Sequence, residues 1–148
     1  MSLNEFSLIQ KYFSSSGESK GVTLGVGDDC AILDIPEGKQ LVATVDTLVE
    51  GVHFPVSASP ADIAHRSLRV NLSDIAAMGA DPHWFTLALT LPKVSESWLC
   101  DFSQALLSDA LYFGCSLVGG DTTAGPLSIT MQVLGTIPIG SGLTRGGC

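Results

Sequence analysis

Residues 60–80 constrain the fold more than any other part of the chain, because they read PADIAHRSLRVNLSDIAAMGA without a break. A proline is favoured in the first turn of a helix and Gly79 provides a stop, so the segment predicts one long helix. Its polar stripe consists of Asp62, Arg66, Arg69 and Ser73. Its apolar stripe consists of Ala64, Leu68, Leu72, Ile75 and Ala76. A helix with one apolar stripe has to bury it against another layer of secondary structure.

The segments around this helix alternate between strand and helix character. Strands are predicted at 22–26, 31–35, 41–49, 84–91, 116–118 and 127–137. Apolar residues have helical spacing at 3–13, where Asn4 is a suitable cap, and again at 95–112. The turn PEGK at 36–39 predicts a hairpin of the second and third strands, and 119–126 is interpreted as a turn. The order predicts one α+β domain, 1–148, with a mixed or antiparallel sheet and two long helices on one face.

The charge of the chain limits its ligands. Fifteen acidic residues stand against seven basic ones, which gives a net charge of −8. A nucleic-acid-binding protein needs a basic face, and no cluster of cations is present to make one. A ligand that carries phosphates would be repelled unless divalent cations lay between its phosphates and the carboxylates of the protein.

The cysteines and the start of the chain bear on its location. Cys30, Cys100, Cys115 and Cys148 form no C-x-x-C pair, so neither a disulfide framework nor a zinc site is predicted. We expect reduced, mostly buried thiols. No signal peptide is recognisable, and no apolar run is long enough to span a bilayer. These features predict a cytoplasmic protein without a membrane contact.

Several aspartates have glycines and apolar residues as neighbours instead of lysines and arginines: Asp28, Asp29, Asp46, Asp74 and Asp121. A carboxylate in such surroundings is usually paired, hydrogen-bonded or bound to a metal, because an isolated buried charge is very costly. Carboxylate oxygens from several loops, with a threonine hydroxyl nearby, suit magnesium. Glycines beside them would let a phosphate approach the backbone N–H groups. We therefore predict that these side chains converge on a magnesium and phosphate site.

Each of these residues also has an ordinary structural interpretation. Asp28 and Asp29 could form a simple turn, 119–122 could be a tight turn, and Asp74 could be a solvated helix residue. Asp46 could be structural, and His53 could be a loop histidine. His65 and His83 are interpreted as structural. The H-E-x-x-H motif, the Walker P-loop and the G-x-G-x-x-G fingerprint are absent from the sequence.

Four motifs together resemble a known family. They are GVGDDCA at 25–31, DTLVEGVHF at 46–54, NLSDIAAMGADP at 71–82 and GGDTTAGP at 119–126. Their order and spacing are similar to those of thiamine-monophosphate kinases, within the aminoimidazole ribonucleotide synthetase-like superfamily. The likeness runs from about Phe6 to Arg145, and the VEGVHF segment is typical of the kinase.

The resemblance implies that ATP phosphorylates thiamine monophosphate to thiamine diphosphate. It assigns several magnesium ions to Asp29, Thr44, Asp46, Asp74 and Asp121. It assigns ATP to Gly120, Asp121 and Arg145, and the thiamine substrate to His53. No side chain is expected to act as a nucleophile or general base, because phosphoryl transfer needs mainly alignment and charge neutralisation. The family forms homodimers in which the sheets of these domains pair.

Two departures from the family pattern affect the expectations. Val45 stands where the family commonly has a hydroxyl residue, so only a backbone contact could be made there. The family also continues into a second domain, so we expect this chain alone to be inactive. Two alternatives stay open: another ATP-dependent enzyme of the superfamily, of the aminoimidazole ribonucleotide synthetase or selenophosphate synthetase type, and a non-catalytic dimerisation module.

Overall fold

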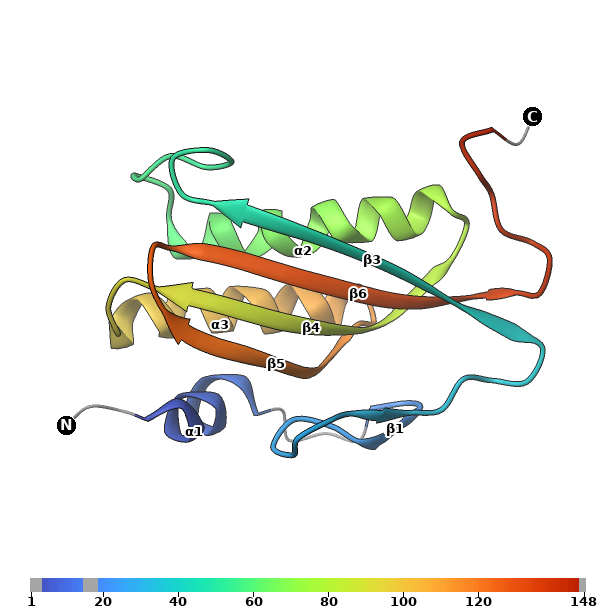
Figure 1. Ribbon diagram of the computed structural model, residues 1–148, viewed down its shortest axis with the longest axis horizontal. Coiled ribbons are helices and arrows are strands. Elements are labelled where there is room, and N and C mark those ends of the chain that lie inside the picture. Colours follow the sequence, from blue (N-terminus) through green and yellow to red (C-terminus); the bar gives the residue numbers. More distant parts are fainter. Residues whose placement is uncertain (1–3, 15–18, 147–148) are drawn as a thin grey trace.

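The computed structural model describes residues 4–14 and 19–146. Its centre is one four-stranded mixed sheet in the order β3-β6-β4-β5 (Figure 1). β4 and β5 are parallel, whereas β6 is antiparallel to both of its neighbours. The four strands are β3 Lys39–Val49, β4 Asp81–Leu91, β5 Ser116–Ala124 and β6 Ser128–Pro138.

Two long helices, α2 (Pro60–Ala77) and α3 (Glu96–Tyr112), cover one face of this sheet (Figure 1). The Ser59 side chain caps α2 by accepting from Asp62 N at 3.1 Å, and Ser95 caps α3 in the same way. The predicted fold class is therefore confirmed. The apolar stripe predicted for α2 is also confirmed, except that Ala76 is exposed.

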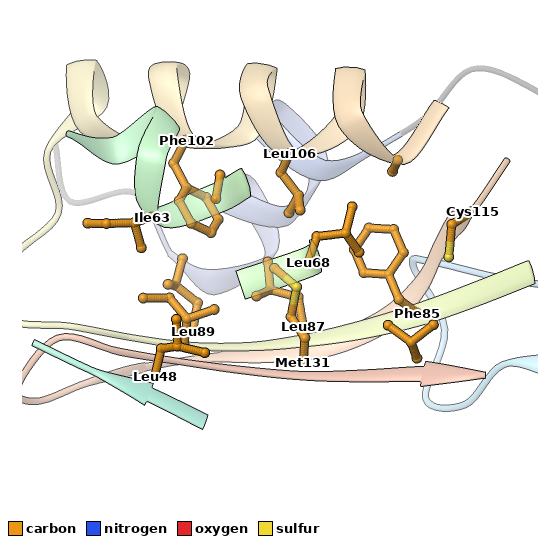
Figure 2. Packing of buried hydrophobic residues seen from close by; sticks show 14 of the residues in the cluster. Leu48, Ile63, Leu68, Phe85, Leu87, Leu89, Phe102, Leu106, Cys115 and Met131 are labelled. Atoms are coloured by element: carbon orange, nitrogen blue, oxygen red, sulfur yellow. The ribbon is translucent and has the colours of Figure 1, made fainter. Parts of the chain in front are cut away.

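The core lies between the helices and the sheet (Figure 2). Phe102 and Leu106 of α3 are completely buried there. The sheet contributes alternate residues, because successive side chains of a strand point to opposite faces. In β6 these are Ile129, Met131 and Val133, all 0% exposed. This layer fixes the positions of the strands whose ends and edges carry the aspartates.

The N-terminal region adds a short helical segment and a second, smaller sheet, and Leu8 and Phe13 of the helical segment belong to the main core. A short α1 (Glu5–Leu8) continues as the π-helix η1 (Ile9–Phe13), and Asn4 caps it by accepting from Ser7 N at 2.8 Å. β1 (Val22–Leu24) and β2 (Ile32–Leu33) then pair as a two-stranded antiparallel sheet. Part of the region packs on the main sheet, because Trp84 Nε1 donates to Lys20 O at 3.1 Å.

The hairpin predicted across residues 36–39 is wrong. β2 pairs with β1, and β3 pairs with β6 along its whole length, from Lys39 opposite Pro138 to Val49 opposite Ser128. An eleven-residue strand satisfies far more backbone groups against β6 than against the two residues of β2. A turn at 37–38 is present, but it connects two different sheets.

The turn predicted at 119–126 is also wrong over residues 119–124, because β5 continues to Ala124. Gly120 lies in this strand opposite Leu87, with φ +155. A Cβ at position 120 would lie 1.8 Å from Leu87 O. Glycine is needed here because the two strands approach closely. Turns also favour glycine, so the residue type alone does not distinguish a turn from a close strand contact.

The face of the sheet away from the helices carries exposed side chains on β3. Leu48 belongs to the core, so alternation places the odd-numbered residues of β3 on the other face. Leu41 and Val45 are 46% and 58% exposed there. No helix in the described ranges is long and apolar enough to cross a membrane.

Candidate functional site

Thr44, Asp46 and Asp74 lie on the facing surfaces of β3 and α2, and we call them the β3–α2 group. Thr44 and Asp46 share the row of β3 that ends at buried Leu48 and faces the helix. Asp74 projects from α2, and its Oδ2 accepts from Thr44 Oγ1 at 3.4 Å. This bond is long, so the two oxygens are not locked together. The predicted threonine thus contacts one predicted carboxylate, and the other, Asp46, lies two residues further along the same row of β3.

A second group of predicted residues lines a cavity of about 310 Å³ at the β5 edge. We call Asp28, Asp29, Gly120 and Asp121 the β5 group. The loop after β1 supplies the first two residues, and β5 supplies the last two. Side chains of η1, including Phe13, form part of the wall. Three aspartates and the backbone of Gly120 therefore line one space, together with Glu5.

The two groups lie at opposite edges of the sheet. β6 and β4 separate β3 from β5, so the strands are three spacings, or about 14 Å, apart. Among residues 4–14 and 19–146, no three His, Cys, Asp or Glu side chains are close enough to hold one metal ion. The described part of one chain thus holds the predicted residues in two separate groups, and the shared magnesium site stays a prediction.

Exposure differs from what the apolar neighbours in the sequence indicated. Asp28, Asp29, Asp74 and Asp121 are exposed, and Asp46 is half-buried. The cost of burying a charge therefore applies to Asp46 at most. Of the glycines beside these aspartates, Gly120 allows close approach to Leu87, whereas a Cβ at Gly27 would meet nothing within 4 Å.

The other two predicted binding residues lie at opposite ends of the domain. His53 follows β3, where its Nδ1 accepts from Val49 N at 2.9 Å, so a neutral ring carries its proton on Nε2. Arg145 is exposed in the segment after β6. That segment is tied to the end of α2, because Leu143 N donates to Met78 O at 3.1 Å. The loop after β3 and the segment after β6 lie at opposite ends of the domain (Figure 1), so the structure does not bring these two predicted residues together.

Val45 has a clear position relative to the β3–α2 group. Its side chain lies on the opposite face of β3 from Thr44 and Asp46 and is 58% exposed. A hydroxyl at this position would therefore not face Asp74. Valine has no side-chain oxygen, so residue 45 can offer a ligand only through its backbone carbonyl.

Asn71 is a polar residue to which the sequence assigned no role. It is 0% exposed on α2, one turn before Asp74, and its Nδ2 donates to Ser67 O at 3.0 Å. Its Oδ1 is also buried, but this oxygen has no hydrogen-bond partner within the described ranges. The signal in the sequence was an asparagine inside an apolar helix, three residues before an aspartate.

The donor atoms of the β3–α2 group fit magnesium. All of them are oxygens, as this hard cation prefers. The ion pairs of the described ranges are Lys11–Glu96 and Arg69–Asp109, so no protein cation there neutralises Asp46 or Asp74. The orphaned Asn71 Oδ1 also calls for a donor. The residues present therefore suit a hydrated divalent cation.

The cysteines differ from their predicted burial. Cys30 and Cys100 are exposed, and Cys115 is buried; all three are free thiols. Cys148 lies outside the described residues. Small size and mild polarity let cysteine occupy either environment, so composition alone could not place them.

Comparison with known proteins identifies the family. Residues 27–137 match the family described as AIR synthase related protein, N-terminal domain. The thiamine-monophosphate kinase of Escherichia coli (strain K12) is 54% identical over 148 residues, which are 99% of this chain and 46% of that protein. This chain thus spans about half the length of such relatives.

Solved structures agree with this match. A thiamine-monophosphate kinase from Stenotrophomonas maltophilia K279a has a TM-score of 0.85 and 47% identity, covering 98% of this chain and 46% of that one. A structure described as AaThiL complexed with AMPPCP and TMP has a TM-score of 0.71 and 29% identity, covering 95% of this chain and 43% of that one. The chain therefore belongs to the AIR synthase related proteins, whose N-terminal domain it matches, and within them it is related to the thiamine-monophosphate kinases.

Proposed function

We propose that the protein carrying these residues transfers the γ-phosphoryl group of ATP to thiamine monophosphate, giving thiamine diphosphate and ADP. The observation that carries this proposal is the 54% identity to a thiamine-monophosphate kinase across nearly the whole chain. The similar structure that is described with AMPPCP and TMP supports the same pair of substrates. The two exposed free thiols, Cys30 and Cys100, fit a reducing compartment, and the cytoplasm is the proposed location.

The proposed role of the aspartates is to hold magnesium against the nucleotide. Asp29, Thr44, Asp46, Asp74 and Asp121 would supply the oxygen ligands. Bound magnesium would neutralise charge on the phosphates, which is the main demand of phosphoryl transfer. With a net charge of −8, the chain would otherwise repel ATP.

The remaining predicted residues would orient the substrates. The backbone beside Gly120 and Asp121 would bind phosphate oxygens in the cavity at the β5 edge. Arg145 would contact ATP, and the Nε2–H of His53 would donate to the thiamine substrate. No covalent intermediate is proposed, so these groups act by position.

The proposed assembly is a homodimer that pairs the open faces of the two sheets. The β3–α2 group and the β5 group are at opposite edges of one sheet, so one copy cannot join them. A two-fold axis that lies between the facing sheets and runs parallel to the strands would place β3 of one copy towards β5 of the other. The exposed Leu41 and Val45 on that face would then be buried.

The test uses a protein that contains these 148 residues and is as long as the relatives, and it measures product formation. We expect thiamine diphosphate from thiamine monophosphate and ATP, measured by chromatography. Asp46→Asn should abolish most of this activity, whereas Asp101→Asn, the same charge change on an exposed part of α3, should not. Turnover of an aminoimidazole precursor or of selenide, with no thiamine diphosphate formed, would contradict the proposal.

A further inference from the structure

The orphaned Oδ1 of Asn71 needs a hydrogen-bond donor. Asn71 is 0% exposed, and its amide nitrogen already donates to Ser67 O. Exchanging the amide oxygen and nitrogen would set two acceptors against each other, so the orientation is fixed. A buried acceptor without a partner is unfavourable by about 1–3 kcal/mol. Such a group in a native structure usually marks an ordered water or a ligand.

The antiparallel course of α2 and β3 brings Asn71 to a level near that of Asp46. β3 ends where the loop to α2 begins, so the helix runs back along the strand (Figure 1). The bond between Thr44 and Asp74 sets the register of the two elements. Three residues back along the helix is about 4.5 Å, and two residues on along the strand is about 6.7 Å in the same direction. Asp46 is therefore the residue on the helix-facing row of β3 that follows Thr44 in the direction of Asn71.

This arrangement leaves acceptors without donors. Asp46 is a carboxylate, and Asn71 presents an amide oxygen with no partner within the described ranges. The nearest hydroxyl of the group, Thr44 Oγ1, donates to Asp74. A water molecule could donate to both, and a cation bound by the two aspartates would fix that water in place.

We infer that Asn71 is a positioning residue for a divalent cation, and that its Oδ1 accepts a hydrogen bond from a water bound to that cation. The cation lies between Asp46 and Asp74, on the more exposed side, and Asn71 lies beneath it. This inference rests on the metal-binding part of the proposed function. It adds a fully buried residue that fixes the water ligand, and through it the cation.

The test measures Mn²⁺ binding to the 148-residue chain by calorimetry, together with the Tm with and without Mn²⁺. Asn71→Leu has similar volume but no acceptor, and Asn71→Asp keeps an acceptor. Ser73→Ala is the matched control, because Ser73 is exposed on the same helix. We expect Asn71→Leu to lose about 10- to 100-fold in Mn²⁺ affinity. Its Tm without metal should be unchanged or higher, and Ser73→Ala should bind as the wild type does.

Wild-type affinity in a folded Asn71→Leu variant would overturn the inference, and so would a wild-type chain that binds no Mn²⁺. If Asn71→Leu does not fold, Asn71→Asp decides the question. The inference predicts that Mn²⁺ restores part of the Tm lost in Asn71→Asp, whereas an equal loss with and without Mn²⁺ would overturn it. The proposed kinase activity is judged separately, from thiamine diphosphate formation by the longer protein.

Discussion

At the scale of single residues, burial controls the reactivity of the thiols. Burial raises the pKa of the Cys115 thiol to about 12, whereas Cys30 and Cys100 are exposed. The thiolate is the reactive form, so Cys115 is expected to resist alkylation. Iodoacetamide at pH 8, followed by peptide mass spectrometry, should modify Cys30 and Cys100 in the folded protein and Cys115 only after unfolding. Equal rates for Cys100 and Cys115 would contradict this burial.

His83 is expected to make the domain sensitive to acid. Burial lowers the pKa of His83 below its ordinary value of 6.5, and its Nε2 hydrogen-bonds Thr136 Oγ1 at 2.8 Å. Below about pH 6.5 the unfolded chain therefore binds a proton that the folded chain resists, so the free energy of unfolding falls as the pH falls. The fall continues down to the lowered pKa.

The measurement is urea unfolding of the wild type and His83→Gln at pH 7.5 and pH 5.5. Glutamine keeps a hydrogen-bonding side chain without this titration, so its loss of stability between the two pH values should be smaller. An identical loss in both would show that His83 does not contribute.

The sequence predicted which aspartates would lie on facing elements better than it predicted their surroundings. Asp46 and Asp74 stand out because no cation neighbours them in the chain, and the structure does place them on facing elements. Their exposure could not be inferred, since apolar neighbours in a strand or helix point in other directions. The orphaned acceptor of Asn71 was also beyond reach, because hydrogen-bond partners are set by tertiary packing.

At the scale of elements, the close contact of β5 with β4 depends on one glycine. A Cβ at Gly120 would lie 1.8 Å from Leu87 O, whereas a Cβ at Gly119 would have Thr86 Cγ2 as its nearest neighbour at 4.0 Å. Gly120→Ala should therefore lower the free energy of unfolding by about 2 kcal/mol or more, through backbone strain and overpacking. Gly119→Ala should stay within about 1 kcal/mol of the wild type.

Urea unfolding of the two variants checks this difference. Equal stability of Gly120→Ala and Gly119→Ala would contradict the close strand contact. Both glycines line the cavity at the β5 edge. A difference in stability between the two variants therefore reports on the strand contact and not on their shared position in the cavity wall.

Elements with strong local signals were predicted well, and strand partners were not. Pro60 and Ser95 begin the two helices, and β6 shows its alternation in Ile129, Met131 and Val133. The choice of β6 as the partner of β3 is a contact between distant segments, which local turn residues cannot reveal. Glycine has several uses, so 119–120 looked like a turn although it is strand.

At the scale of the whole molecule, the open sheet face is where the proposed homodimer forms. Val45→Glu would place a charge in this face, where Val45 is 58% exposed in one copy. We expect the wild type to be a dimer and Val45→Glu a monomer in light-scattering measurements. Val94→Glu is the control, because Val94 is 50% exposed before α3, on the helical side. A Val45→Glu dimer as tight as the wild type would place the interface elsewhere.

We expect aspartates on separate elements to hold Mg²⁺ against the phosphates of a nucleotide. The decisive measurement is calorimetric titration of the full-length protein with AMPPCP, in Mg²⁺ and in EDTA. Binding should require Mg²⁺, with affinity reduced about 10-fold or more in Asp46→Asn and unchanged in Asp101→Asn. Equally tight binding in EDTA, or wild-type affinity in Asp46→Asn, would contradict this expectation.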